Sequence, residues 1–180
     1  MAQHFTSANT SVNGNKLPKI FKLAADFLSD TIERKHVNLD FGGGKFDNAT
    51  EYLAQRGVTN LVYDPFNRSD EHNQKVLEQV KARGGADTIT CSNVLNVIDD
   101  NATMYNVINQ CAHLVANGGS VFFTVYEGDK SGIGRQTKKD CYQRNTPLSD
   151  YYDIIHHYFA VVVMHRGLIT ARIPCCHIKV

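Results

Sequence analysis

The chain has 180 residues, which suits one domain, because two domains of half this length would each bury only a small core. Its hydrophobic fraction of 42% and charged fraction of 21% are ordinary for a globular protein, and a formal net charge of +1 gives no global attraction to nucleic acid or acidic membranes. No apolar run approaches the ~20 residues of a membrane span, and residues 1–6 lack the basic start and apolar stretch of a signal peptide, so we expect a cytoplasmic protein.

The cysteines do not predict a disulfide framework, since there are five of them without paired spacing. Cys175, Cys176 and His177 are adjacent, which raises the possibility of a metal site. Structural zinc sites usually separate paired thiolates by two to four residues, however. We therefore expect free thiols and no bound metal.

The N-terminal part divides into an arm and the start of a domain. Residues 1–16 are mostly polar and predict a flexible arm, followed by a single domain over residues 17–180. Apolar residues at helical spacing over 17–33 predict a helix that packs on the core. Residues 37–41 are mainly apolar and end in glycines, a pattern typical of a buried strand.

Strands and helices are then expected to alternate. Asn48 and Glu51 resemble a capping box that opens a helix closing near Gly57, and residues 61–63 form a short strand before Pro65. The remaining expected elements are a charged helix over 70–83, a strand over 88–91, a helix that starts at 99–100 and stops at Asn117, Gly118 and Gly119, and a strand over 121–125. Such alternation predicts a mostly parallel sheet with helices on both faces.

The C-terminal part departs from this alternation. A helix over 149–158 is expected to lead to strands over 160–164 and 168–172, joined by the short turn at 165–167. Strands joined by so short a turn must be antiparallel. The sequence therefore predicts an α/β fold of the Rossmann-like, doubly wound type, with about six strands of which the last is antiparallel.

A ligand site is expected where the first strand ends, because open α/β sheets bind ligands beyond the carboxyl ends of their strands. Gly42, Gly43 and Gly44 follow that strand and allow close approach of the backbone to a ligand. Asp64 ends the second strand, where a carboxylate can accept both hydroxyls of a ribose. Because Asp40 would repel a pyrophosphate, the pair of acids favours a cationic nucleoside without phosphate. The glycines could also form a purely structural turn, and Asp64 a turn before Pro65.

Several segments resemble the class I S-adenosylmethionine (SAM)-dependent methyltransferases. Residues 37–44 are similar to the first motif of that family, residues 87–95 to its fourth-strand segment, and residues 114–123 to the glycine turn that enters its fifth strand. The terminal helix and antiparallel pair also match. The resemblance covers about residues 35–173 and implies SAM as cofactor, bound by Asp40, the three glycines and Asp64.

Two departures from the family pattern change what the resemblance implies. The third glycine of the family motif falls at Phe46, and the interval from Asp64 to Asp87 is too short for a strand plus a second helix. The usual third strand and its adenine-binding acid are therefore expected to be missing. Pro65, Phe66 and Asn93 become the candidates for holding the adenine.

A narrower resemblance concerns residues 93–98 and the polar segment after the fifth strand. Both are similar to small phage-encoded methyltransferases and to the cofactor domain of methyltransferases associated with DNA phosphorothioation. The family places its catalytic groups beyond the fourth and fifth strands, which implies Asn93, Tyr126 and Glu127 here. Asn93 and Asn96 could instead cap the following helix. The Pro-containing motifs of the family's amino-methylating and cytosine C5 branches are absent after the fourth strand.

Residues 128–144 form an unusual segment, with three glycines and five basic residues where the acceptor is expected to enter. Arg135 and Lys138 could contact an anionic part of the acceptor while Tyr142 stacks on a base. The alternative is a solvated loop without a ligand.

The sequence thus favours a methyltransferase acting on a nucleotide-containing acceptor, such as nucleic acid, or on a small molecule. Two other functions compete with it: a SAM-binding subunit or sensor that does not methylate, and an NAD-type Rossmann enzyme. Asp40 and the missing third glycine disfavour the NAD-type enzyme.

Overall fold

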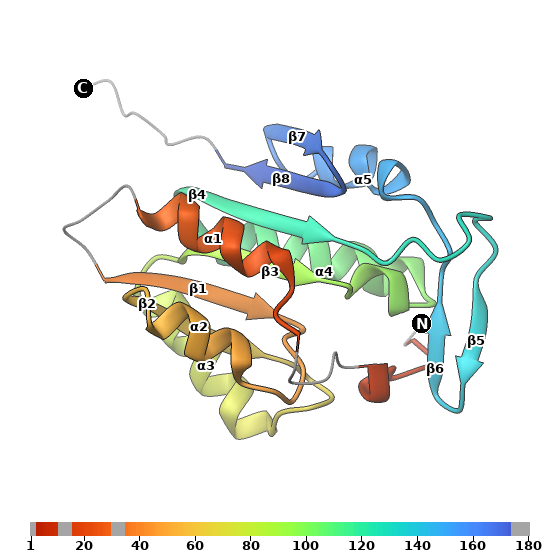
Figure 1. Cartoon of the computed structure of the whole chain (residues 1–180), viewed down its shortest axis with the longest axis horizontal. Helices are drawn as coiled ribbons and strands as arrows, with labels where there is room; N and C mark the ends of the chain where they lie inside the picture. Colours follow the sequence, from red (N-terminus) through yellow and green to blue (C-terminus); the bar gives the residue numbers. More distant parts are fainter. Residues whose placement is uncertain (1–2, 11–15, 30–34, 174–180) are drawn as a thin grey trace.

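The computed structural model describes residues 3–10, 16–29 and 35–173 (Figure 1). Cys175, Cys176 and His177 lie outside the described residues. Among the described residues, the helices are α1 (Lys19–Ser29), α2 (Asn48–Ala54), α3 (Asp70–Ala82), α4 (Asn101–Leu114) and α5 (Tyr152–His156), with 3-10 turns η1 (Ala8–Thr10), η2 (Leu95–Val97) and η3 (Leu148–Tyr151). The strands are β1 (His36–Phe41), β2 (Val58–Tyr63), β3 (Ala86–Ser92), β4 (Val115–Thr124), β5 (Arg135–Lys138), β6 (Cys141–Gln143), β7 (Val161–His165) and β8 (Leu168–Arg172).

The main sheet has six strands in the order β2-β1-β3-β4-β8-β7. β2, β1, β3 and β4 are parallel, whereas β8 is antiparallel to both β4 and β7. Arg166 and Gly167, both with positive φ, make the tight turn between β7 and β8. This topology confirms the predicted sheet with its antiparallel last strand. No helix in the described ranges combines the length and apolar character that a membrane crossing requires.

The third strand of the usual order is absent between β2 and β3, because α3 connects these two strands directly. Side chains of α3 bond the outer edge of β2 instead. The Nε2 atom of His72 lies 2.8 Å from the carbonyl oxygen of Val62. Asn73 accepts from the backbone N–H of Asp64 at 3.0 Å and donates to its carbonyl at 2.9 Å. The short interval after Asp64 thus predicted the topology correctly.

Helices cover both faces of the sheet (Figure 1). α1 and α2 pack on one face with Phe122, and α3, α4 and α5 pack on the other around the larger apolar cluster. Side chains alternate along β1, so that Leu39 belongs to the larger cluster while Asn38 faces the opposite way, toward buried polar groups. The helix expected over 17–33 is observed from Lys19 to Ser29, with an apolar face in the core as predicted.

A buried polar network joins β1, β2 and β3 beneath α1 and α2. Asn38, which is fully buried, donates to Asn60 at 2.7 Å and to Thr90 at 3.0 Å, and it accepts from Thr88 at 2.8 Å. Asn60 in turn donates to Thr50 of α2 at 3.0 Å. Because each of these partners is buried or half-buried, Asn38 is the centre on which their hydrogen bonding depends.

Two sequence expectations about helix ends are corrected. α2 has no capping box: Asp47 is the N-cap residue without a side-chain cap bond, and Asn48 donates to Lys16 instead. α4 ends at Leu114, and the glycines expected to stop it lie inside β4, where the pairing with β3 shifts register. A Cβ at Gly119 would lie 2.8 Å from the carbonyl of Asp87, so this bulge requires a glycine.

The segment expected to be a loop over 128–144 contains the β5–β6 hairpin, which stands apart from the main sheet (Figure 1). Lys139 and Asp140 form its tip, and Asp140 has a φ of 58°. All four residues of β5 are exposed. A strand without a buried face shows no alternation of apolar residues, which is why the sequence pattern missed it.

The polar network generates a stability prediction. Asn38→Ala removes three hydrogen bonds and leaves Thr88, Asn60 and Thr90 short of partners in the interior, so we expect a loss of about 2–4 kcal/mol in the free energy of unfolding. Urea unfolding followed by circular dichroism measures this loss. Thr59→Ala, at an exposed position of β2, is the control and should cost less than about 1 kcal/mol. Equal losses for the two variants would contradict the role of Asn38.

Candidate functional site

A cavity of about 260 Å³ opens at the carboxyl ends of β1, β2 and β3. All eight residues predicted to bind a cofactor line it: Asp40, Gly42, Gly43, Gly44, Asp64, Pro65, Phe66 and Asn93. The cavity lies where the strand order reverses between β1 and β3, the position at which open α/β sheets bind ligands.

The glycine turn after β1 leaves no room for side chains. Gly42 has a φ of 75°, and a Cβ on it would lie 2.4 Å from Cγ2 of Val94. A Cβ on Gly43 would lie 2.4 Å from a carboxylate oxygen of Asp40. The backbone N–H of Gly42 donates to the carbonyl of Tyr63 at 2.7 Å, which ties the turn to the end of β2. The turn therefore serves both the backbone geometry and the cavity.

Asp64 organises the loops around the cavity. Its buried carboxylate accepts from the backbone N–H of Gly44 at 2.8 Å, and from the N–H groups of Phe66 and Asn67 at 2.9 Å each. One side chain thus fixes both the glycine turn and the loop after β2. This explains why an aspartate stands before Pro65: it forms the turn and faces the cavity at once.

Arg68 holds the glycine turn from outside. Its Nε atom donates to the carbonyl of Gly44 at 2.9 Å, and its guanidinium pairs with Asp47 at 2.7 Å. The sequence pattern gave no indication of this contact, because Arg68 lies 24 residues after Gly44 in the chain.

Asp40 is the buried acid of the site. Its side chain is 3% exposed and accepts from Thr90 at 3.3 Å. Burial raises the pKa of Asp40 from 3.8 to about 7; the bond from Thr90 and the charge of Arg68 lower it, and the charge of Asp64 raises it further. A buried carboxyl group with this pKa gains from a positive charge placed beside it.

Asn93 enters the cavity from the end of β3. It has a φ of 57°, a conformation that asparagine tolerates better than most residues, and its N–H donates to the carbonyl of Thr124 at 2.8 Å. Neither Asn93 nor Asn96 caps α4, because Asp100 is the N-cap residue. Asn96 is buried and donates to Gln143 at 3.0 Å.

The other predicted catalytic residues do not line the cavity. Tyr126 is 65% exposed. Glu127 accepts from the N–H of Leu148 at 2.8 Å and pairs with Lys130 at 2.8 Å. The bond from Leu148 and the pairing with Lys130 lower the pKa of Glu127. Glu127 therefore orders the chain after β4, and its catalytic role stays a prediction that this geometry does not favour.

The predicted acceptor-binding residues also lie outside the cavity lining. Arg135 is exposed and lies 3.8 Å from Asp129, and Lys138 is exposed on the same strand. Tyr142 stacks on Phe5, with ring centroids 5.6 Å apart. The structure brings these three residues together on the β5–β6 hairpin but not with Asp40 and Asp64.

Sequence reasoning missed the starts of α1 and α2 in the cavity wall, and two further parts of it. One is α4, where a stripe at helical spacing, polar except for Val107, faces the cavity: Thr103, Asn106, Val107 and Gln110. The other comes from residues 3–10, the described portion of the expected flexible arm. Spacing along residues 101–114 could have revealed the first, whereas nothing local marks the second. Among the described residues, no group of three or more His, Cys, Asp or Glu side chains is placed to hold a metal ion.

Comparison with solved structures supports the fold at low sequence identity. An O-methyltransferase family protein from Burkholderia thailandensis matches with a TM-score of 0.56 and 16% identity over 88% of this chain, which spans 57% of that protein. The 1,6-didemethyltoxoflavin-N1-methyltransferase of the same organism, solved with S-adenosylhomocysteine, matches with a TM-score of 0.61 and 16% identity over 86% of this chain and 78% of its own. The sugar N-methyltransferase KedS8 from Streptoalloteichus matches with a TM-score of 0.60 and 9% identity over 97% and 94%.

Sequence comparison identifies the family directly. None of the curated proteins is detectably similar in sequence. The family described as a methyltransferase domain matches residues 16–159, which include both acids and the glycine turn of the cavity. The chain therefore belongs to the methyltransferase domain family.

Proposed function

We propose that this protein transfers a methyl group from SAM to an acceptor that enters over the carboxyl ends of β3 and β4. One observation carries the proposal: the glycine turn, Asp40 and Asp64 line a single cavity at the strand-order reversal of a methyltransferase domain. When bound, SAM supplies a methyl group that its sulfonium activates. The protein contributes the alignment of the acceptor with that group.

The residues of the cavity fit such a cofactor. All three glycines of the turn line the cavity, and without side chains they allow a ligand to approach the backbone closely. The buried carboxyl of Asp40, with its raised pKa, suits a ligand that carries positive charge on its amino and sulfonium groups. Asp64 is the candidate partner of the ribose hydroxyls, since a carboxylate oxygen has more than one acceptor site.

The adenine would lie between the loop after β2 and the start of α4, in contact with Pro65, Phe66 and Asn93. These residues line the cavity, and Phe66 is 46% exposed there, which leaves its ring available to a base. The amide groups of Asn106 and Gln110 lie along the same wall and can donate and accept hydrogen bonds. They take the place of the acid that the missing third strand would supply.

The acceptor belongs to the side of the cavity formed by the end of β3, with Asn93 as the candidate positioning residue. A nucleotide-containing acceptor and a small molecule are both compatible with methyl transfer. The narrower likeness to phage-encoded and phosphorothioation-associated methyltransferases rests on residues 93–98 and, like the cytoplasmic location, stays a prediction. Binding of SAM without methyl transfer to any acceptor would favour the regulatory alternative.

Ligand-dependent stability tests the proposal. Saturating S-adenosylhomocysteine should raise the melting temperature by several degrees, because a ligand bound only by the folded state stabilises it, by about 2.7 kcal/mol at 100 times the Kd. NAD is the control ligand and should give no shift. Calorimetric titration gives the affinity directly. Absence of binding by the wild-type protein would refute the proposed function.

The role of Asp64 is tested in the same assay. Asp64→Asn should weaken S-adenosylhomocysteine binding about 10- to 100-fold, since hydrogen bonds to a charged acceptor contribute about 1.5–3 kcal/mol. Asp70→Asn makes the same charge change at an exposed position of α3 outside the cavity lining, and it should leave the affinity unchanged. Equal affinities for the two variants would remove Asp64 from the binding site.

The raised pKa of Asp40 predicts a pH dependence of cofactor binding. Below pH 7 the carboxyl is mostly protonated and neutral, and above pH 7 it is ionised and attracts a cation. The affinity for SAM should therefore rise about ten-fold between pH 5.5 and 7.5. One ionising group can change the free energy of binding by at most ~1.4 kcal/mol per pH unit, so a rise of this size lies within its range. Asp40→Asn should bind weakly and without this rise, whereas Asp70→Asn should keep it. Titration calorimetry at both pH values measures the effect, and a pH-independent wild-type affinity would contradict it.

A further inference from the structure

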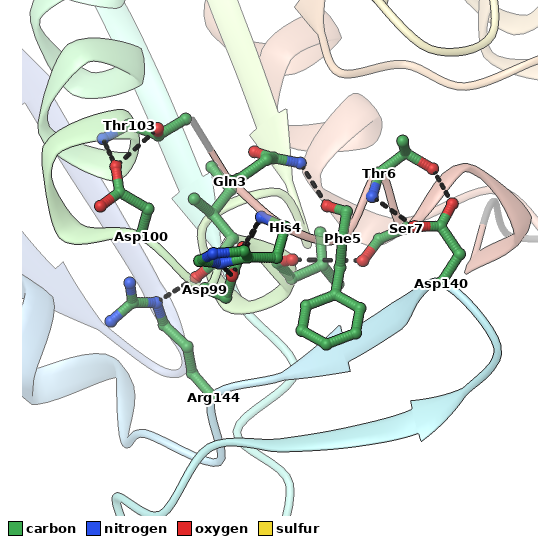
Figure 2. A network of polar contacts seen from close by, with 12 residues as sticks. Gln3, His4, Phe5, Thr6, Ser7, Asp99, Asp100, Thr103, Asp140 and Arg144 are labelled. Carbon is green, nitrogen blue, oxygen red and sulfur yellow. Dashed lines mark hydrogen bonds and ion pairs between the residues drawn. The ribbon is translucent and has the colours of Figure 1, made fainter. Parts of the chain in front are cut away.

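Residues 3–10 lie across the cavity, although they are remote in sequence from its other walls. Five of these residues line it: Gln3, Thr6, Ser7, Ala8 and Thr10. Their anchoring contacts are made with the chain that follows β3 and with the β5–β6 hairpin that follows β4 (Figures 1 and 2). We call this segment the strap.

Ser7 is the central anchor of the strap. It is 4% exposed, and its backbone N–H donates to the carbonyl of Asp140 at 2.9 Å. Its hydroxyl donates to the carbonyl of Val97 at 3.2 Å and accepts from the N–H of Tyr142 at 3.2 Å. Ser7 has a φ of 52°, which is uncommon outside glycine and persists where the surroundings determine it. The strap is therefore seated at Ser7 by contacts on both sides.

The neighbours of Ser7 add three further contacts, and Figure 2 shows the two hydrogen-bonded ones, at Thr6 and His4. The carboxylate of Asp140 accepts from the backbone N–H of Thr6 at 2.9 Å and from the Thr6 hydroxyl. Phe5 stacks on Tyr142 with ring planes 16° apart. His4 contacts Asp99 through its backbone N–H at 3.1 Å and through Nδ1 at 2.8 Å. These anchors all follow β3 or β4, and none follows β2.

The anchors of the strap lie at one end of the cavity, and the loop after β2 lies at the other. Asp64, the candidate ribose partner, follows β2 at one end. The strap crosses the other end, beside Val97 and Ile98, where the acceptor must approach the methyl group if the proposed function holds. We propose that the strap is the acceptor-side wall of the site, which closes over cofactor and acceptor together, so that the acceptor is a small molecule held inside the cavity. This inference rests on the proposed function.

Such a wall must open for exchange, and the contacts of the strap allow this. Apart from those of Ser7, they are mainly hydrogen bonds of the exposed residues His4 and Thr6 to the carboxylates of Asp99 and Asp140, each contributing about 1.5–3 kcal/mol. A segment held in this way opens locally far more often than the whole domain unfolds. Release of the cofactor product should therefore be limited by opening of the strap, and weaker anchors should speed it.

The experiment measures the rate at which S-adenosylhomocysteine leaves the wild-type protein and an Asp140→Gly variant. Glycine keeps the positive φ of the hairpin tip while it removes the carboxylate that holds Thr6. We expect release about ten times faster, as loss of hydrogen bonds to a charged acceptor implies. Thr6→Ala, which leaves the hairpin intact, is a second variant and should speed release to a smaller extent. Lys139→Ala, at the exposed neighbouring position of the same turn, is the matched control and should release the ligand at the wild-type rate.

The outcomes separate this inference from the proposed function. Absence of S-adenosylhomocysteine binding by the wild-type protein would overturn the proposed function and the inference with it. Binding with equal release rates in all four proteins would overturn the strap alone. A second measurement adds a 20-nucleotide single-stranded DNA to the wild-type complex. No effect on release is expected, and slower release would show that a nucleic acid covers the cavity and would overturn the small-molecule acceptor.

Discussion

The site depends on the hydrogen bonds that the carboxylate of Asp64 accepts. Three backbone N–H groups, from the glycine turn after β1 and the loop after β2, meet at this one side chain. Without it, the two loops would be joined by little more than the bond from Arg68 to Gly44 and the bond from Gly42 to Tyr63, and the cavity between them would be held less firmly. The carboxylate of Asp40, buried nearby, supplies the complementary electrostatic property, a preference for a positive ligand. Geometry comes from one acid and charge preference from the other, and both act on the cavity beside the glycine turn.

Buried polar side chains also organise the sheet beneath the site. Buried Asn38, Asn60, Thr88 and Thr90 form hydrogen bonds across three strands, at positions where apolar side chains would be usual. The layer of polar side chains fixes the register of the parallel strands, since a shifted strand would leave its polar groups without partners. Register in turn fixes the heights at which Asp40 and Asp64 end their strands, so the polar layer supports the cavity from below.

Much of this arrangement could be predicted from the sequence. The parallel core, the terminal hairpin, the missing third strand and the gathering of eight candidate residues in one cavity all follow from local patterns: glycine turns, apolar runs and the length of one connection. The contacts of Arg68, Ser7 and Asp140 could not be predicted, because each joins segments distant in sequence by bonds that leave no periodic trace. For the same reason, the sequence predicted Tyr126 and Glu127 near the cavity, whereas Tyr126 is exposed and Glu127 bonds the backbone of Leu148. Local patterns predict where a site lies, but not which remote segments close it.

The direct connection through α3 leaves β2 as the edge of the sheet, and His72 and Asn73 bond the backbone groups of that edge. An open edge of this kind would otherwise offer free N–H and carbonyl groups to a strand of another molecule. By bonding the carbonyl of Val62 and both backbone groups of Asp64, α3 removes these three groups from any such pairing. The helix that stands in place of a third strand thus caps the end of β2 beside the cavity, at the residue whose carboxylate joins the two loops.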